Sequence, residues 1–328
     1  MPKKLPLVTV LMATYNGEEY VAEQIESILA QTYPNIQIMI ADDQSGDQTV
    51  SIVRKYEKEY ENLILRVNES RLGYVRNFEQ LLRNASGLYF AFSDQDDVWV
   101  PEKISVMMHA MLQQEADEPG KAVMVHSDST MINAHGKELF DSYARYRNYF
   151  FSEEKDIPTM ISKCGVMGNT MLINEPLRNM VLPFDPDVIH HDYWIAVINE
   201  LFGSRVSLDE PLVRYRIHER NASKKLDLLK KKKTFKPAKL AQLLPYHDNN
   251  RYQVLKAVIN RFEVSKEDKR PIVLFLQYLR AQNGWIKHYP VMVREGFFKS
   301  SIRSHSKLLG RLALASLKPK KTAKAAAK

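Results

Sequence analysis

Five carboxylates stand directly behind two short apolar runs of the sequence. Asp42 and Asp43 follow the run IQIMIA, and Asp94, Asp96 and Asp97 follow the run LYFAF and one serine. Three carboxylates so close together repel one another, and a bound cation would relieve that repulsion. Carboxylate oxygens are the hard ligands that Mg²⁺ and Mn²⁺ prefer. The segment SDQDD therefore predicts a divalent metal site, and a solvated acidic turn is the alternative.

Apolar runs of this kind recur through the first half of the chain. They are apolar on both faces, which is typical of buried parallel strands, and they cover residues 7–13, 36–41, 63–67, 88–92 and 123–126. Helical periodicity is present over 18–31, after Gly73 and after Pro101, and further helices are expected around 246–262 and 270–289. The alternation predicts an open, mostly parallel, doubly wound α/β sheet. Residues 150–220 show a mixed pattern that predicts α+β structure.

The ends of the predicted strands bring polar residues together. In an open α/β sheet, ligands bind beyond the carboxyl ends of the strands. The polar residues at these ends are Thr14, Tyr15, Asn16 and Gly17 after the first run, Asp42 and Asp43 after the second, and Asp94, Asp96 and Asp97 after the fourth. We therefore expect three strand ends to converge on one crevice. The sequence contains no GxxxxGK[ST] phosphate loop, no GxGxxG dinucleotide loop and no HExxH metal motif.

The composition limits the classes of protein to which the chain can belong. The chain has 328 residues, of which 45% are hydrophobic, enough for one large domain with an appendage. Its single cysteine, Cys164, excludes an internal disulfide and favours a reducing compartment. No run approaches the roughly 18 uncharged apolar residues of a membrane-spanning helix. We interpret the apolar N-terminal run as a buried strand rather than a secretory signal, because no small-residue cleavage site follows it. A cytoplasmic protein is predicted, soluble or peripheral on a membrane.

Charge divides the chain into two parts. Residues 221–328 carry 26 Lys and Arg against 6 Asp and Glu, a net charge of +20, which leaves −12 for residues 1–220. We expect an α/β domain over 1–222, a basic and mainly helical region over 223–318, and a disordered basic tail over 319–328. The basic region shows no nucleic-acid-binding module, so no nucleic acid partner is predicted. Its predicted partner is an anionic membrane surface, and charges that only keep the helices soluble are the alternative.

Six motifs resemble those of family-2 glycosyltransferases. Four of them are in order over residues 7–105: VTVLMATYNGEEYVAEQIESILAQTY, IADDQSGDQT, RLGYVRNFEQLL and FAFSDQDDVW. The later motifs HHDYW and YRIHERN extend the resemblance to about residue 222. It implies the GT-A fold and inverting, metal-dependent transfer of a sugar from a nucleotide diphosphate donor.

The resemblance also implies roles for individual residues. The nucleotide pocket would be lined by Thr14, Tyr15, Glu18, Asp42 and Asp43. The diphosphate and ribose would be contacted by Arg76, Asn77 and Asp94. The Mg²⁺ or Mn²⁺ ion would be held by Asp96, with Asp94 and His218 close to it and Asp97 behind. Asp192 matches the catalytic base, although His191 stands where the family usually has Glu. The acceptor wall would include Gly168, Asn169 and His191.

The donor and the acceptor are specified less closely. The form of SDQDDVW and HHDYW is most similar to bacterial rhamnosyltransferase-like members, which would make dTDP-L-rhamnose the donor and leaves a UDP-sugar open. The expected acceptor is a lipid-linked or growing bacterial surface polysaccharide at the inner face of the plasma membrane, and a homo-oligomer stays open. Two other functions remain as alternatives. One is a haloacid-dehalogenase-like phosphohydrolase with Asp94 as its nucleophile, and the other is a non-catalytic membrane-associated scaffold.

Overall fold

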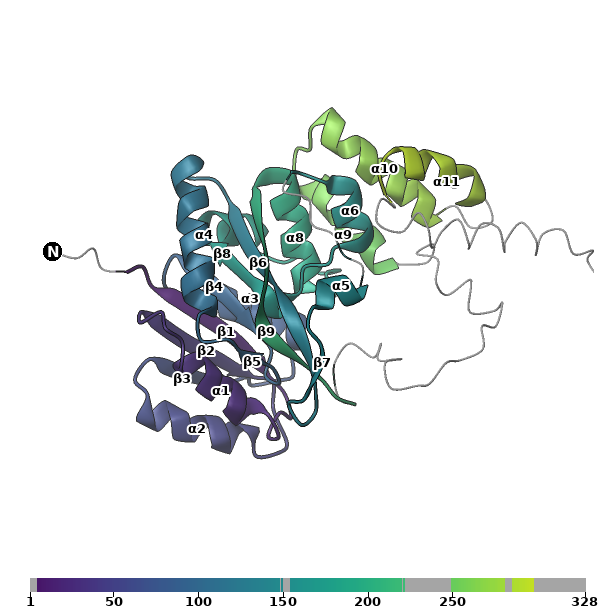
Figure 1. The fold of residues 1–328 in the computed structure, drawn as a ribbon. Coiled ribbons are helices and arrows are strands. Elements are labelled where there is room, and N and C mark those ends of the chain that lie inside the picture. Colours follow the sequence, from purple (N-terminus) through teal and green to yellow (C-terminus); the bar gives the residue numbers. More distant parts are fainter. Residues whose placement is uncertain are drawn as a thin grey trace, which may run out of the picture.

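The computed structural model of the protein describes residues 5–147, 149, 154–219, 221, 249–280 and 285–297. Within these ranges the core is a nine-stranded sheet in the order β3-β2-β1-β4-β8-β6-β9-β5, with β7 paired to β6 (Figure 1). The strands are β1 Val8–Thr14, β2 Ile36–Asp42, β3 Leu63–Val67, β4 Tyr89–Ser93, β5 Val98–Trp99, β6 Val123–Asn133, β7 Glu138–Phe140, β8 Met171–Asn174 and β9 Ser204–Ile217.

The first four strands of the long path are parallel, as the sequence predicts. β1 pairs with β2 on one side and with β4 on the other, and β2 pairs with β3. Thr14 at the end of β1 lies opposite Asp42 at the end of β2, so the polar segments behind these strands begin at the same edge. β8 is antiparallel to β4 and to β6, while β6 and β9 run parallel to each other.

Helices cover both faces of the sheet. One face packs on α1 Val21–Leu29, α2 Thr49–Glu59 and α4 Lys103–Asp117. The other packs on α3 Tyr74–Asn84, α6 Ile157–Lys163, α7 Glu175–Val181 and α8 His191–Phe202. Alternate residues of β1 supply the two cores, with Val10 in the first and Leu11 in the second. This doubly covered arrangement explains why the runs are apolar on both faces.

β9 is the longest strand, and the sequence did not predict it. It holds Asp209, Glu210 and Pro211, residues that are depleted in strands. Its register with β6 shifts around Asp128, where Pro211 pairs, so the strand accommodates the proline at a bulge. A short helix, α5 Tyr143–Arg147, follows β7 beside this part of the sheet (Figure 1).

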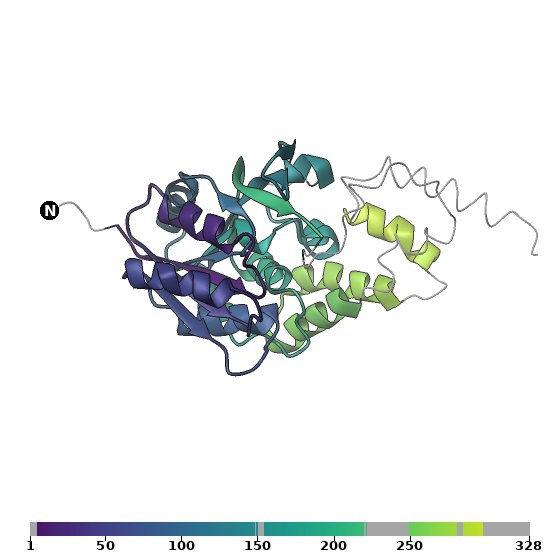
Figure 2. The same ribbon diagram turned by 90° about the horizontal axis from the view of Figure 1, so that it is seen from below.

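The C-terminal helices form a further layer on the α8 side. They are α9 Asn249–Arg261, α10 Lys266–Arg280 and α11 Trp285–Arg294, seen at the far end from α1 and α2 in Figure 2. Val254 and Phe275 belong to the same hydrophobic core as Trp194 of α8. These helices are therefore packed onto the α/β domain. Most of the predicted basic excess, and the tail 319–328, lie outside the described residues.

Helix length and apolarity also bear on membrane crossing. Across the described residues, no helix is both long enough and apolar enough to span a bilayer.

Candidate active site

The carboxyl ends of β1 and β2 are joined by buried hydrogen bonds. Thr14 Oγ1 donates to Asp42 Oδ2 over 2.8 Å, and Asp42 also accepts from Ser45. Asp43 accepts from the backbone N–H groups of Leu72 and Gly73, over 2.6 and 2.8 Å. Asp42 and Asp43 are 0% and 3% exposed, and the hydrogen bonds that they accept position the loops around the crevice. Their contact with a nucleotide stays a prediction.

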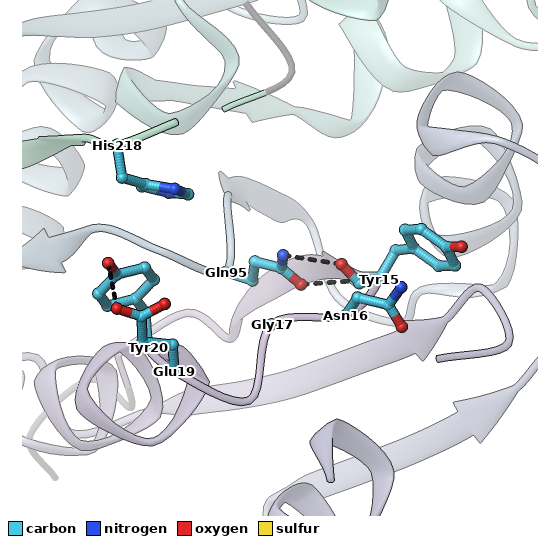
Figure 3. Close-up of a pocket in the computed structure, with 7 residues that line it drawn as sticks. All are labelled: Tyr15, Asn16, Gly17, Glu19, Tyr20, Gln95 and His218. Atoms are coloured by element: carbon cyan, nitrogen blue, oxygen red, sulfur yellow. Dashed lines mark hydrogen bonds between the residues drawn. The ribbon is translucent and has the colours of Figure 1, made fainter. Parts of the chain in front are cut away.

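A pocket of about 210 Å³ opens beyond these strand ends (Figure 3). It is lined by Tyr15, Asn16, Gly17, Glu19, Tyr20, Gln95 and His218. The Gln95 amide accepts from Tyr15 N over 2.8 Å and donates to Tyr15 O over 3.0 Å, which ties the segment behind β4 to the segment behind β1. A Cβ at Gly17 would lie 2.4 Å from Gln95 Oε1, so a side chain at this position would displace the Gln95 amide.

The predicted donor residues Glu18, Asn77 and Arg76 are not among the residues that line this pocket. Glu18 accepts from Gln48 N at the start of α2, over 2.8 Å. Asn77 is 1% exposed and donates to the carbonyl of Ala41 in β2. Arg76 donates to Glu79 and to the carbonyls of Phe184 and Asp185, so its guanidinium holds the loop that leads to α8. The predicted contacts of Arg76 and Asn77 with a diphosphate stay predictions.

Asp96 and His218 are 122 residues apart in the sequence and meet in the fold. His218 Nε2 lies 2.9 Å from Asp96 Oδ2, and Figure 3 shows the imidazole pointing into the pocket. Asp97 points the other way and accepts from Asn169 Nδ2 and from Arg216 N. Arg216, 2% exposed, also donates from Nε to the carbonyl of Asp96 over 2.8 Å. The buried partners of Asp97 and Arg216 therefore orient Asp96 toward His218.

Negative charge accumulates behind this pair. Burial and the charges of Asp97, Asp96 and Asp192 raise the pKa of Asp94 well above its usual range. Burial, followed by the charge on Asp96, raises the pKa of Asp97 to about 7.

The buried side chain of Lys103 partly offsets this charge. Lys103 is 0% exposed, donates to the carbonyl of Asn169 over 2.6 Å and lies 3.4 Å from the centre of the Trp99 ring. Burial lowers the pKa of Lys103 well below its usual range, while Asp97 and Asp94 oppose that shift.

The donor set suits a divalent ion that is shared with a substrate. Among the described residues, no three His, Cys, Asp or Glu side chains are grouped so that they could hold a metal by themselves. Asp96 and His218 nevertheless offer a carboxylate and an imidazole 2.9 Å apart, beside the pocket that His218 lines, and the charge on Asp96 acts on the nearby Asp94 carboxyl. Mg²⁺ commonly binds one or two carboxylates and completes its shell with water and substrate phosphates. The residues therefore fit an ion that arrives with a phosphorylated ligand.

Asp192 lies in the first turn of α8 and faces the same charged centre. Its Oδ1 accepts from Tyr193 N over 2.7 Å. Asp192 is near enough for its charge to raise the pKa values of Asp94 and Tyr74, in both cases after burial as the main cause. The Tyr74 hydroxyl lies 2.7 Å from His190 Nδ1. Tyr74 was missed by sequence reasoning because it reads as the first residue of an ordinary amphipathic helix.

The three predicted acceptor residues form a buried wall. His191 is 5% exposed, and its ring lies 4.2 Å from that of Phe78 and 5.5 Å from that of Phe92. Neither ring nitrogen has a hydrogen-bond partner among the described residues, and burial lowers the His191 pKa to about 4. A Cβ at Gly168 would lie 2.6 Å from His191 Nε2, and Asn169 is 2% exposed. An acceptor contact of these residues stays a prediction.

Comparison with known proteins identifies the family. The model of glycosyl transferase family 2 matches residues 9–177, just over half of the chain. The chain belongs to this family. WfgD of Escherichia coli, a UDP-Glc:α-D-GlcNAc-diphosphoundecaprenol β-1,3-glucosyltransferase, is 26% identical over 220 residues, 66% of this chain and 79% of that protein. TuaG of Bacillus subtilis (strain 168), a putative teichuronic acid biosynthesis glycosyltransferase, is 33% identical over 109 residues, 33% of this chain and 43% of that protein.

Solved structures share the fold of this family 2 member. The mannosyltransferase PcManGT from Pyrobaculum calidifontis, in complex with GDP-Man and Mn²⁺, has a TM-score of 0.57 at 19% identity, over 97% of this chain and 83% of that one. S. aureus TarS 1-349, in complex with UDP, has a TM-score of 0.55 at 16% identity, over 90% of this chain and 82% of that one. The predicted GT-A fold is confirmed.

Proposed function

We propose that this protein is an inverting, metal-dependent glycosyltransferase that moves a hexose or deoxyhexose from a nucleotide diphosphate to a glycan hydroxyl. The observation that carries the proposal is the Asp96–His218 pair at 2.9 Å, whose imidazole lines the pocket, with Asp94 and Asp192 near enough for their charges to interact. A haloacid-dehalogenase-like phosphohydrolase is not favoured, because family membership argues for sugar transfer.

Each group of residues in the crevice would have its own role in the reaction. Asp96 and His218 would hold Mg²⁺ or Mn²⁺ together with the donor diphosphate, whose departing charge the ion neutralises. Tyr15 and Gln95 would line the nucleotide, and Asp94 would contact its ribose. Asp192 would take the proton of the acceptor hydroxyl as its oxygen attacks the anomeric carbon. One base and one displacement invert the configuration of that carbon.

A UDP-hexose is the donor that we favour, and a lipid-linked glycan is the acceptor. The name of the E. coli relative specifies UDP-Glc and a diphosphoundecaprenol acceptor, and TarS binds UDP. dTDP-L-rhamnose is the narrower prediction of the sequence, and the names of these relatives do not support it.

A donor screen tests this proposal. We expect the wild-type protein with Mn²⁺ to release nucleoside diphosphate slowly from one class among UDP-, GDP- and dTDP-sugars, because water can replace the acceptor at the anomeric carbon. Release should accelerate when a glycan acceptor is added. Hydrolysis of simple phosphate esters without release from any nucleotide sugar would instead support the phosphohydrolase.

We also propose that the basic C-terminal part holds the protein at an anionic inner membrane surface, where a lipid-linked acceptor would be found. Each Lys or Arg near such a surface contributes about 1 kcal/mol. Removing this part is a poor test, because α9 and α10 share the core of α8. We expect the full chain to bind vesicles with anionic lipid and to leave them as salt rises, since the screening length falls to about 3 Å at 1 M salt. Binding that salt does not weaken would contradict the proposal.

A further inference from the structure

A surface near Asp192 carries a group of aromatic side chains, which we name the α5 cluster. It consists of Phe140, Tyr143, Tyr146, Tyr149 and Tyr215, together with Arg147. The Tyr143 ring meets the Tyr215 ring edge-on at 5.7 Å, and the Phe140 and Tyr146 rings lie 4.7 Å apart. Phe140 and Tyr146 are each 41% exposed, so part of the cluster faces solvent.

The sheet holds this cluster in place. Asp128 lies at the bulge of β6, accepts from Ala144 N over 3.0 Å and accepts from the Ser142 hydroxyl. These bonds anchor the start of α5 to the sheet. Tyr215 stands in β9 three residues before His218, which lines the pocket, and its ring packs against Tyr143. A rigidly held aromatic surface beside a reaction centre is a suitable platform for a ligand.

The cluster also lies close to the predicted base. Burial raises the pKa of Tyr143 to about 12, and the charge on Asp192 adds to that shift. The charge on Asp192 therefore acts both on Asp94, at the donor site, and on Tyr143 of this cluster. The residues that the sequence assigns to the acceptor, Asn169 and His191, are 2% and 5% exposed, so the α5 cluster is the more accessible surface next to Asp192.

Arg147 gives the cluster a chemical preference. Its guanidinium lies 5.9 Å from the Tyr143 ring centre and 5.7 Å from the Tyr149 ring centre. In the part of the chain that the structure describes, no carboxylate pairs with Arg147, whereas Arg145 on the same helix pairs with Asp141 at 2.7 Å. Arg147 Nη2 donates to the Tyr149 hydroxyl over 3.4 Å. A guanidinium with no carboxylate partner among the described residues suits a phosphate group, which it can bind with two parallel hydrogen bonds.

We propose that the α5 cluster is the acceptor subsite and that it binds a sugar linked through a diphosphate, with the sugar ring against the tyrosines and a phosphate on Arg147. This inference rests on the proposed function and names its acceptor class. The apolar face of a pyranose ring buries well against an aromatic ring. The anionic linkage supplies the negatively charged partner that Arg147 lacks among the described residues. The sugar hydroxyls then lie on the side of the cluster that Asp192 borders.

Two probes that differ by the diphosphate group test the inference. They are N-acetylglucosaminyl diphosphate with an octyl chain and the uncharged octyl glycoside of the same sugar, each titrated by NMR in the presence of UDP and Mg²⁺. We expect wild type to prefer the diphosphate. Arg147→Gln should weaken the binding of the diphosphate probe on the order of ten- to a hundredfold, because one charged hydrogen-bonding group is lost. Its affinity for the neutral probe should stay that of wild type. Tyr143→Leu should weaken both probes.

Arg145→Gln is the matched control, since it removes an arginine from the same helix whose partner is Asp141. Equal affinities of Arg147→Gln and Arg145→Gln for the diphosphate probe would overturn the inference, and so would a wild-type protein that binds neither probe. Release of nucleoside diphosphate from the donor in water, measured on the same proteins, does not depend on this subsite. If that release persists while the probe titrations contradict the inference, only the assignment of the subsite is wrong. If the release is absent, the proposed function is wrong.

Discussion

Replacing Asp192 by asparagine is expected to lower turnover by about 10²- to 10⁴-fold, with donor affinity nearly unchanged. Asparagine has nearly the same shape and can still accept from Tyr193 N, but it cannot take a proton from the acceptor. Steady-state kinetics should show the loss in kcat rather than in the KM for the donor. Hydrolysis of the donor by water should fall as well, because water that attacks the same carbon needs the same base.

Asp187→Asn is the control for this change. Asp187 is an exposed carboxylate in the loop before α8, so its replacement makes the same chemical change outside the crevice. We expect wild-type kinetics from this variant. An Asp192→Asn enzyme with wild-type kcat would mean that Asp192 only shapes the start of α8, and the base would then have to be sought among the other residues near Asp94.

The second large effect is expected at Asp96. Asp96→Asn should reduce transfer on the order of 10³-fold and should weaken donor binding in the presence of Mn²⁺, because a charged ligand of the ion becomes neutral. The fold should persist, since an amide can still bond to His218 Nε2 and since the buried contacts of the segment are made by Asp97. Donor binding should be measured by calorimetry with and without the metal.

The two carboxylate variants should therefore fail in different ways. Asp96→Asn loses donor affinity and metal dependence, whereas Asp192→Asn keeps both and loses turnover. Asp209→Asn, at an exposed position of β9, serves as the control for Asp96 and should keep the affinity of wild type. Full activity of Asp96→Asn, or of wild type in excess chelator, would rule out the metal assignment.

Much of the site follows from local sequence patterns, because parallel strands place their carboxyl ends at one edge. The apolar runs predicted β1 to β4 and the edge at which Thr14, Asp42 and Asp94 stand. The proximity of Asp96 to His218 could not be predicted from spacing alone, since 122 residues separate them; only the resemblance brought them together. The structure supplies the reason, which is the antiparallel pairing of β5 with β9.

Other features were hidden because they depend on tertiary contacts. Lys103 reads as a solvated residue at the start of a helix, yet it lies buried between Trp99 and the carbonyl of Asn169. Arg216 reads as one charge in a basic segment, yet it bonds to Asp96, Asp97 and Glu23. The α5 cluster depends on a bulge at Asp128 that no local sequence pattern predicts. In each case a polar group is buried because distant partners satisfy it.

Thermal unfolding with UDP and Mn²⁺, added singly and together, tests the central claim most directly. If the ion is shared between Asp96, His218 and a diphosphate, each ligand alone should stabilise the protein little, and both together should stabilise it by more than the sum of the single effects. A ligand pair at 100 times its dissociation constant would add about 2.7 kcal/mol to the free energy of unfolding. Stabilisation by UDP that is the same with and without Mn²⁺, or no stabilisation by any nucleoside diphosphate, would contradict the account.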